Sequence, residues 1–411
     1  MRSFHSVQRR VLVVFLFSSQ VILADPFCPP ASQILTKWDL WSHGTCLRGA
    51  NIWQKVIDPN TDGDSLGPGP VGPPLEPQEF VQLASWGANY VNISFPGIYS
   101  EEPPYLPNPD VVARLDALID EAAKANLFVV ISLRTGPGRN EGTFNASLNK
   151  SVDNNIWKKT EARRAWAQMW QYVAQRYSHT PNVVAYDLMV EPNSNDVWLK
   201  IYDSKAFYPG FANSTYDWNP LARQLTEAIR QVDSSTPLMV GAMNYSDVDW
   251  LWALGDNGDP KTIYSLHPYV PSEYTNQYPP FAVSYPGVVT DFNGAPVSFD
   301  QTWLKATLQP VVDFKTTRNV PIAVNEFGVM RWEPGADKYM ADLMSFFETI
   351  GVNHAYWLWE VAYPITFDEF NLRHGPDFNN HTDVETSDLI NAIQADWKRN
   401  GIRPNDVLGH W

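Results

Sequence analysis

The chain has 411 residues, of which 44% are hydrophobic and 18% charged, a composition that indicates a folded globular protein and excludes a largely disordered one. Its formal net charge of −15 repels nucleic acid and anionic membrane surfaces, so neither is expected as a partner. The length accommodates one large domain or two of medium size.

Residues 1–24 have the features of a secretion signal. Arg9 and Arg10 precede an apolar run over 11–17, and Ala24 supplies a small residue for cleavage. A membrane anchor is the alternative, but the run is short for a bilayer span and polar residues follow it. No later segment is long enough to cross a bilayer, and the C-terminus lacks the hydrophobic tail of a lipid-anchor signal. We expect a secreted, extracellular protein without a membrane span, whose net charge falls from −15 to −18 because the leader holds three Arg and no acid.

Cys28 and Cys46 are the two cysteines of the chain, and both follow the leader closely. In a secreted chain a disulfide between them is expected, and it would fasten an N-terminal arm over residues 25–46. Two cysteines without clustered His argue against a structural zinc site. Asn92 lies in an Asn-x-Ser sequon inside an expected strand, so we expect it to carry no glycan. The other sequons predict a glycoprotein, and they lie at Asn145, Asn149, Asn213, Asn244 and Asn380.

From residue 47 onward, short apolar segments alternate with segments in which apolar residues have helical spacing. The expected strands lie at 47–53, 89–95, 127–133, 182–190, 237–243, 262–269, 321–327 and 354–360. The expected helices lie at 77–87, 109–126, 157–177, 220–233, 301–316, 336–351 and 387–400. Pro310 should kink or divide the fifth of these helices.

The strands are almost continuously apolar, as parallel strands buried on both faces are. This pattern predicts an α/β fold in which residues 47–411 form one (β/α)8 TIM barrel with long loops after the strands. A doubly wound open sheet is the rival architecture. Such sheets usually carry a Gly-rich loop after the first strand, and "ANIWQKV" has none.

Two acids end expected strands on opposite sides of the barrel. Glu191 follows the fourth strand in "LMVEPN", and Glu326 ends the seventh in "AVNEFG". Because the carboxyl ends of barrel strands meet at one mouth, these carboxylates can converge on one ligand. Glycoside cleavage needs such a pair, one protonated to release the leaving oxygen and one ionised to attack the anomeric carbon. Glu141 and Glu360 are rival acids that could also reach the mouth.

Residues that could bind a sugar or support a catalytic carboxylate lie at the ends of neighbouring strands. His267 and Tyr269 lie in "LHPY", Trp357 and Trp359 lie in "YWLWE", and Arg134 ends the third strand. Taken singly, each has an ordinary explanation as an ion-pair partner, a hydrogen-bonded histidine or a core aromatic. Their joint placement favours a site for sugars, in which a Tyr hydroxyl keeps a carboxylate ionised and an indole forms an apolar floor under a pyranose.

These motifs resemble glycoside hydrolase family 5, the cellulase-type barrels with catalytic Glu on strands four and seven. The resemblance covers about residues 47–400 and rests on "NEFG", "HPY" and the tryptophan near the end of "YWLWE". It implies Glu326 as the nucleophile, Glu191 as the acid/base, retention of anomeric configuration and no cofactor or metal. It further implies that His267, Tyr269 and Trp359 belong to the substrate site.

Two positions depart from the family pattern. Val190 stands where an Asn usually precedes the acid/base and bonds the sugar 2-hydroxyl, and Asn92 stands where an Arg usually ends strand two. We expect Arg134 to balance the charge of Glu326 instead, and Asn193 or Asn325 to bind the sugar hydroxyl. The departures leave the substrate and the subfamily open.

Aromatic residues crowd the loops that follow the strands, and aromatic faces stack on the C–H faces of sugars. Trp332, just after the seventh strand, is expected to bind substrate. The other candidates are Trp198, Tyr202, Tyr208, Trp218, Tyr274, Tyr278, Phe281 and Tyr285.

The sequence therefore predicts a secreted, monomeric, retaining β-glycosidase that acts on a β-linked glucan, mannan or related glycoside. The alternative is a non-catalytic carbohydrate-binding or cell-wall protein on a decayed barrel, for which Val190 and Asn92 are the support. The presence of both Glu191 and Glu326 argues against that alternative, because a decayed site needs neither. The sugar, the aglycone and endo or exo action depend on loop geometry and stay open.

Overall fold

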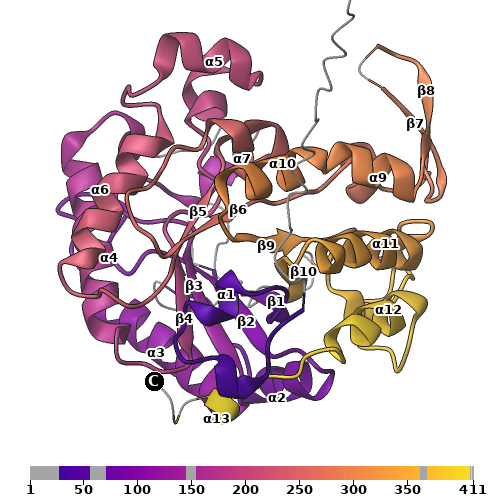
Figure 1. Cartoon of the computed structure of the whole chain (residues 1–411), viewed down its shortest axis with the longest axis horizontal. Helices are drawn as coiled ribbons and strands as arrows, with labels where there is room; N and C mark the ends of the chain where they lie inside the picture. Colours follow the sequence, from indigo (N-terminus) through magenta and orange to yellow (C-terminus); the bar gives the residue numbers. More distant parts are fainter. Residues whose placement is uncertain are drawn as a thin grey trace, which may run out of the picture.

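A computed structural model describes residues 27–55, 71–144, 154–291, 293–361, 368–407 and 409 of the chain (Figure 1). The predicted secretion signal lies outside these residues. Eight parallel strands form a closed barrel in the order β1-β10-β9-β6-β5-β4-β3-β2. The predicted (β/α)8 fold is therefore confirmed.

The barrel strands fall where the apolar segments predict them, because both of their faces are buried. They are β1 (Arg48–Trp53), β2 (Tyr90–Phe95), β3 (Phe128–Leu133), β4 (Val183–Asp187), β5 (Leu238–Gly241), β6 (Thr262–Ser265), β9 (Ile322–Phe327) and β10 (Asn353–Val361). β4 and β6 end earlier than predicted, so Glu191 and His267 stand in the loops just beyond their strands.

Helices cover the outside of the barrel (Figure 1). The longer ones are α2 (Pro77–Ser85), α3 (Pro109–Lys124), α4 (Thr160–Tyr177), α5 (Ser204–Phe211), α6 (Trp218–Arg230), α10 (Gln309–Arg318), α11 (Ala336–Thr349) and α12 (Asp388–Trp397). The shorter ones are α1 (Asp39–Ser42), α7 (Met243–Ser246), α8 (Ser272–Thr275), α9 (Gln301–Thr307) and α13 (Pro404–Val407). The predicted division at Pro310 is confirmed, since this residue sits in the first turn of α10, where a proline costs no hydrogen bond.

The sequence reasoning missed one hairpin. Strands β7 (Gly287–Thr290) and β8 (Pro296–Phe299) pair antiparallel within the long loop after β6. They project from the barrel beside α9 (Figure 1). Their alternation of exposed and buried residues is short and irregular, which left no clear strand signal in the sequence.

The N-terminal arm packs against the end of the barrel at which the strands begin. The predicted disulfide joins Cys28 to Cys46. Trp41 of the arm is buried and donates its indole N–H to the carbonyl of Val184 on β4, 3.0 Å away. The side chains of Ile34 and Leu40 join the core layer formed by the first residues of the strands. In the described part of the chain, no helix combines the length and apolarity that a membrane span requires.

Candidate active site

Glu191, His267 and Glu326 come together at the carboxyl ends of β4, β6 and β9. His267 Nδ1 lies 2.9 Å from Glu191 Oε1 and 3.7 Å from Glu326 Oε2. One ligand atom from each of the three side chains lies within 4.8 Å of the other two. Such closeness matches the short separation of a retaining carboxylate pair, about 5–5.5 Å, and leaves no room for the intervening water of an inverting one.

Tyr269 supports Glu326 directly. Its hydroxyl donates to Glu326 Oε1 at 3.0 Å, which stabilises the ionised carboxylate. Burial raises the pKa of Tyr269 far above its usual range, and the nearby charge of Glu326 acts in the same direction. The tyrosine therefore stays a proton donor near neutral pH.

Asn325 and Asp187 fix the orientation of His267. Asn325 donates its amide to Asp187 Oδ2 at 2.8 Å, which leaves its carbonyl oxygen 3.1 Å from His267 Nε2. Nε2 must therefore carry a proton and donate it to Asn325. Both asparagine groups are used in this way, so Asn325 holds the imidazole from its buried position on β9.

Burial and neighbouring opposite charges shift the pKa values of His267 and Glu326 in opposite directions. Burial lowers the pKa of His267, but the carboxylates of Glu326 and Glu191 outweigh it and raise that pKa to about 9. Burial raises the pKa of Glu326 to about 7, with the negative charge of Glu191 adding to the effect. The positive charges of His267 and Arg134 and the Tyr269 hydroxyl act against that rise. Near neutral pH the imidazole thus carries a proton on the hydrogen bond to Glu191.

Arg134 lies at the mouth, though its hydrogen bonds go elsewhere. Its Nε donates to Glu141 Oε1 at 3.2 Å, and its guanidinium covers the ring of Phe144. Burial alone would lower the pKa of Arg134, yet Glu141, Glu326 and Glu191 together raise it. The rival acid Glu141 is thus the hydrogen-bond partner of Arg134. The positive charge of Arg134 acts on Glu326 through space and lowers its pKa.

Glu191 stands in a strained turn that several groups hold. Its φ of 55° is left-handed, a conformation that costs a non-glycine residue energy. Arg139, which is fully buried, donates from one terminal nitrogen to the carbonyl of Val190 and from the other to the carbonyl of Glu191, both at 2.8 Å. The next carbonyl, that of Pro192, accepts from the backbone N–H of Tyr245 at 3.3 Å.

Asn92, where the family usually has an Arg, takes part in a buried amide network below the site. Its amide donates to Asn51 Oδ1 at 2.6 Å, and its carbonyl oxygen accepts from Ser132 at 2.6 Å. Asn51 in turn donates to the backbone carbonyl of Asn325 at 2.9 Å. The side chain of Asn92 is only 1% exposed, so it supports the strand that carries Glu326 and lies out of reach of a glycan.

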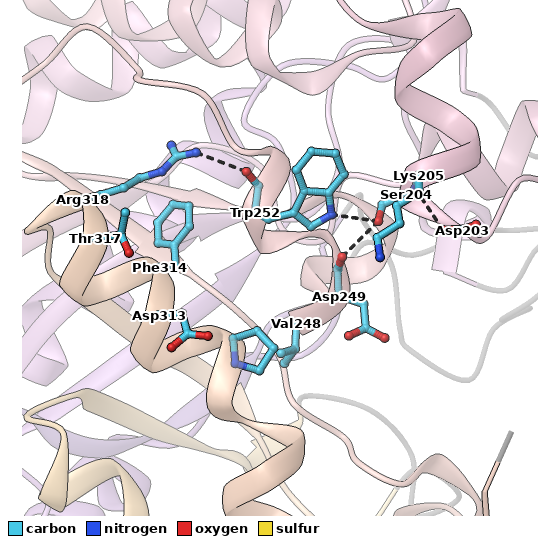
Figure 2. Close-up of a pocket in the computed structure, with 11 residues that line it drawn as sticks. Asp203, Ser204, Lys205, Val248, Asp249, Trp252, Asp313, Phe314, Thr317 and Arg318 are labelled. Carbon is cyan, nitrogen blue, oxygen red and sulfur yellow. Dashed lines mark hydrogen bonds between the residues drawn. The ribbon is translucent and has the colours of Figure 1, made fainter.

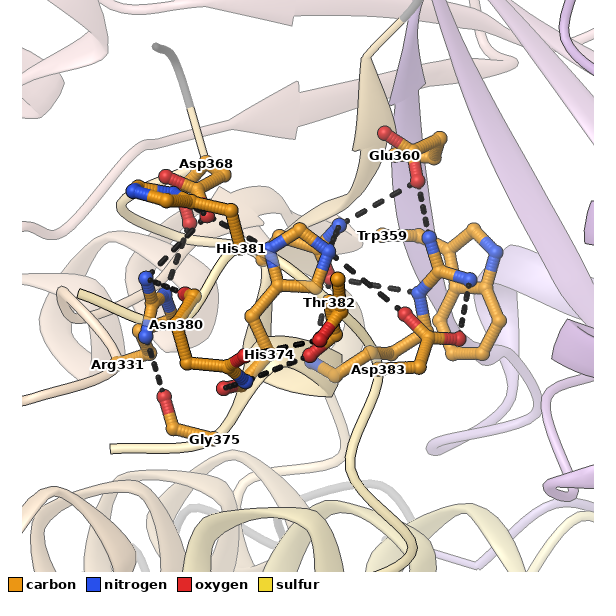
Figure 3. A network of polar contacts seen from close by, with 12 residues as sticks. Arg331, Trp359, Glu360, Asp368, His374, Gly375, Asn380, His381, Thr382 and Asp383 are labelled. Atoms are coloured by element: carbon orange, nitrogen blue, oxygen red, sulfur yellow. Dashed lines mark hydrogen bonds and ion pairs between the residues drawn. The ribbon is translucent and has the colours of Figure 1, made fainter. Parts of the chain in front are cut away.

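The structure does not bring Trp359 to the mouth. Trp359 is fully buried, donates to Glu79 Oε2 at 3.0 Å and packs its ring edge-on against Trp86. Figure 3 shows it beside the polar network around Glu360 and Asp383, and Arg373 lies 4.7 Å above its ring. Its predicted position as a sugar platform is therefore corrected.

Trp357 occupies the place expected for Trp359. Its ring packs against Trp53 and clusters with Tyr269 and Phe370 beside Glu326. The pairing of β10 with β1 explains why Trp357 replaces Trp359 at this place. Tyr356 pairs with Ala50 and Glu360 with Ile52, so β10 advances by four residues where β1 advances by two. The bulge breaks the simple alternation of sides that the sequence pattern assumed.

Two other predicted residues serve the loops around the mouth. Asn193 is fully buried and exchanges hydrogen bonds with Thr143, donating to its carbonyl at 2.9 Å, so its amide ties two loops together. Trp332 is 7% exposed, donates to the carbonyl of Gln277 and packs against Phe378. No hydrogen bond or ring contact described in the structure joins Trp332 to the two catalytic candidates.

The second rival acid, Glu360, belongs to the network of Figure 3. It accepts from Arg373, which also pairs with Glu79 and Asp383. Arg331, labelled in the same figure, is buried, and it donates to the backbone carbonyls of Asp368, Gly375, Asp377 and Asn380. This network fixes the loop after β10 and holds Glu360 in place as a counter-ion.

A cleft of about 710 Å³ lies on the flank, between α5, α10 and the turn Val248–Ala253 (Figure 2). Trp252 is half exposed there and donates its indole N–H to Ser204 Oγ at 3.0 Å. Arg318 donates to the carbonyl of Trp252 at 3.1 Å. Glu191, His267 and Glu326 are not among the residues that line this cleft.

Among the residues that the structure describes, two groups of side chains have the ligand spacing of a metal site. The first is the trio Glu191, His267 and Glu326, whose charges are already matched by hydrogen bonds. The second is Glu348, His354 and Asp396. There Arg48 binds both carboxylate oxygens of Glu348 at 2.7 Å, which already neutralises the charge that would attract a cation.

Sequence reasoning missed the supporting roles of two residues. Asp187 is a lone acid inside the apolar strand "VVAYD", and a buried acid in a strand signals a polar partner within the barrel. Arg139 ends the tight turn "GPGR", where Gly136 and Arg139 exchange backbone hydrogen bonds of 2.9 and 2.8 Å. That turn was visible in the sequence, but the strand end that Arg139 reaches was not.

The chain is similar in sequence to known proteins. The sequence model of the family described as Cellulase (glycosyl hydrolase family 5) matches residues 67–362. Endoglucanase C of Acetivibrio thermocellus is 24% identical over 305 residues, which span 67% of this chain and 81% of that protein. Cellodextrinase A of Ruminococcus flavefaciens is 19% identical over 203 residues, spanning 49% of this chain and 54% of that one.

Solved structures show the same fold. The endoglucanase Cel5A from Thermotoga maritima superimposes with a TM-score of 0.61 at 19% identity, covering 87% of this chain and 99% of that one. A crystal structure described as a glycoside hydrolase gives a TM-score of 0.65 at 17% identity, covering 86% and 99% of the two chains.

Proposed function

Since the chain belongs to glycoside hydrolase family 5, we propose that it is a secreted, retaining β-glycosidase in which Glu326 is the nucleophile and Glu191 the acid/base. The observation that carries this proposal is the triangle of Glu191, His267 and Glu326, whose ligand atoms lie within 4.8 Å of one another. Two carboxylates this close suit a double displacement at one anomeric carbon.

In the first step Glu326 attacks the anomeric carbon and the bond to the leaving oxygen breaks. The proton on the hydrogen bond between His267 Nδ1 and Glu191 Oε1 passes through Glu191 to that oxygen. Tyr269 holds the attacking carboxylate by its 3.0 Å hydrogen bond, and the charge of Arg134 favours its ionised form. The products of this step are the free leaving alcohol and a glycosyl ester on Glu326.

In the second step water attacks the anomeric carbon of the glycosyl ester from the side that the leaving group has vacated. Glu191, now ionised, accepts a proton from that water, and the ester bond to Glu326 breaks. His267 keeps its place through Asn325 and Asp187, so Glu191 returns to its starting hydrogen bond. Two inversions at one carbon give net retention of configuration.

The substrate class is proposed as a β-linked glucan, mannan or related glycoside. Among these substrates we favour a β-glucan, because relatives are named endoglucanase and cellodextrinase. Trp357, close to Tyr269, offers the apolar face on which a pyranose would stack. Secretion and glycosylation are proposed from the leader and sequons, and the disulfide between Cys28 and Cys46 is consistent with an oxidising compartment.

A panel of aryl β-glucosides, β-cellobiosides and β-mannosides tests the proposal with the parent protein and with Glu326→Gln. The parent should hydrolyse at least one of them, and the variant should lose activity by roughly 10³-fold or more. Inactivity of the parent across the panel, with retained binding to soluble β-glucan, would instead favour a carbohydrate-binding protein.

A further inference from the structure

One buried arginine of the loop after β3 reaches across to the end of β4. Arg139 leaves the turn at residues 136–139 and is fully buried, and its guanidinium donates to three backbone carbonyls. They belong to Arg134, Val190 and Glu191, each 2.8 Å from a guanidinium nitrogen. Two of these three carbonyls belong to Glu191 and to the residue before it.

The position of Glu191 needs such support because its backbone is left-handed, with φ at 55°. A residue with a side chain keeps that conformation only where its surroundings impose it. The planar guanidinium bridges the carbonyls on both sides of the Glu191 nitrogen and α-carbon, which fixes the peptide orientation around this residue. The direction of the Glu191 side chain toward His267 follows from that orientation.

The setting of Arg139 holds the guanidinium in place. The backbone of its turn is closed by the reciprocal hydrogen bonds with Gly136, and its charged group lies 4.9 Å from the centre of the Phe144 ring. Burial and the positive charge of Arg134 lower the pKa of Arg139 to about 10, which leaves it charged at neutral pH.

Resting on the proposed function, we propose that Arg139 is a positioning residue that sets Glu191 for proton transfer to the leaving oxygen. Arg139 touches no reacting atom, because it acts on the backbone of the acid/base. Its contribution belongs to the glycosylation step and grows as the leaving group becomes harder to expel without a proton.

The leaving group therefore provides the test. Arg139→Lys keeps the positive charge but cannot donate to the carbonyls of Val190 and Glu191 from two nitrogens at once. Arg139→Ala removes both the charge and the hydrogen bonds. With the best glycon from the aryl glycoside panel, kcat/KM is measured for a 2,4-dinitrophenyl and for an unsubstituted phenyl glycoside, since kcat/KM reports the glycosylation step. Both variants should lose about 10- to 100-fold on the phenyl glycoside and less than about threefold on the dinitrophenyl glycoside, which departs without a proton.

The matched control is Arg331→Lys. Arg331 is also buried and also holds backbone carbonyls, but those carbonyls belong to the loop after β10 (Figure 3). Its loss should lower the melting temperature and change kcat/KM for the two substrates by the same factor. Guanidinium ion added to Arg139→Ala should restore the phenyl glycoside rate more than the dinitrophenyl rate.

Equal losses on both substrates for the Arg139 variants, or no loss on either, would overturn the proposal and make Arg139 a structural residue. If Arg139→Ala does not fold, the lysine variant gives the same comparison. A parent protein that cleaves neither glycoside would refute the proposed function itself, which is a different result from an altered leaving-group dependence.

Discussion

His267 Nδ1 lies 2.9 Å from Glu191 Oε1, and this one hydrogen bond connects the proposed proton donor to the rest of the site. The imidazole is oriented from its other side by Asn325, which is itself held by Asp187. The chain Asp187–Asn325–His267–Glu191 therefore runs from the end of β4, through β9 and the loop after β6, back to the loop that follows β4.

The site should give a bell-shaped pH profile for kcat/KM. Glu326 must be ionised to attack, and its pKa is raised to about 7, so activity is lost as the pH falls through that value. The proton held between His267 and Glu191 must be present, and the pKa of His267 is raised to about 9, so activity is lost as the pH rises through that value. Initial rates on an aryl glycoside from about pH 5 to about pH 10 would measure both limbs. A maximum below about pH 6 would contradict this distribution of protons.

Tyr269→Phe should reduce kcat with little change in KM. The variant removes the donor to Glu326 Oε1 but leaves the ring that packs against Phe370. A hydrogen bond to a charged group contributes about 1.5–3 kcal/mol, so a loss of about 10- to 100-fold is expected. The acid limb of the pH profile should also move to higher pH, because the ionised carboxylate loses a donor. An unchanged acid limb would show that Tyr269 does not stabilise Glu326.

Trp357 and Trp359 should differ sharply when each is replaced by Ala. Trp357→Ala removes the indole beside Tyr269 and should lower kcat/KM of the folded enzyme. Trp359→Ala leaves a hole between the barrel and the helices and should cost about 3–5 kcal/mol of stability, with normal kinetics for the folded fraction. Thermal unfolding and steady-state kinetics on both variants measure these effects. Normal kcat/KM for Trp357→Ala together with a reduced kcat/KM for Trp359→Ala would restore Trp359 as the sugar platform.

The disulfide of the arm should affect stability without affecting catalysis. It closes a loop with a sequence separation of 18, for which chain entropy predicts about 3 kcal/mol. Replacing both Cys28 and Cys46 by Ser should lower the denaturant midpoint by the corresponding amount, and the kinetic constants at 25 °C should stay the same. A change in KM would mean that the arm influences the mouth at the opposite end of the barrel.

The barrel could be predicted from the sequence because apolar strands and amphipathic helices leave strong periodic signals. The pair Glu191 and Glu326 could be placed because acids at strand ends converge in this fold. Trp359 was misplaced because alternation along β10 is interrupted by a bulge, which depends on pairing with β1. The role of Asn325 in holding His267, and that of Arg139 in holding the Glu191 turn, depends on contacts between distant segments, which one sequence does not reveal.

The central claim is that Glu326 forms a covalent bond to the sugar while Glu191 supplies the proton. A 2-deoxy-2-fluoro glycoside with a good leaving group slows the second step and traps the ester, which can be found by mass spectrometry of the digested protein. The structure predicts one glycosyl label on the peptide that contains Glu326, with time-dependent loss of activity. A label on Glu191, Glu141 or Glu360, or a product of inverted configuration without any label, would contradict the assignment.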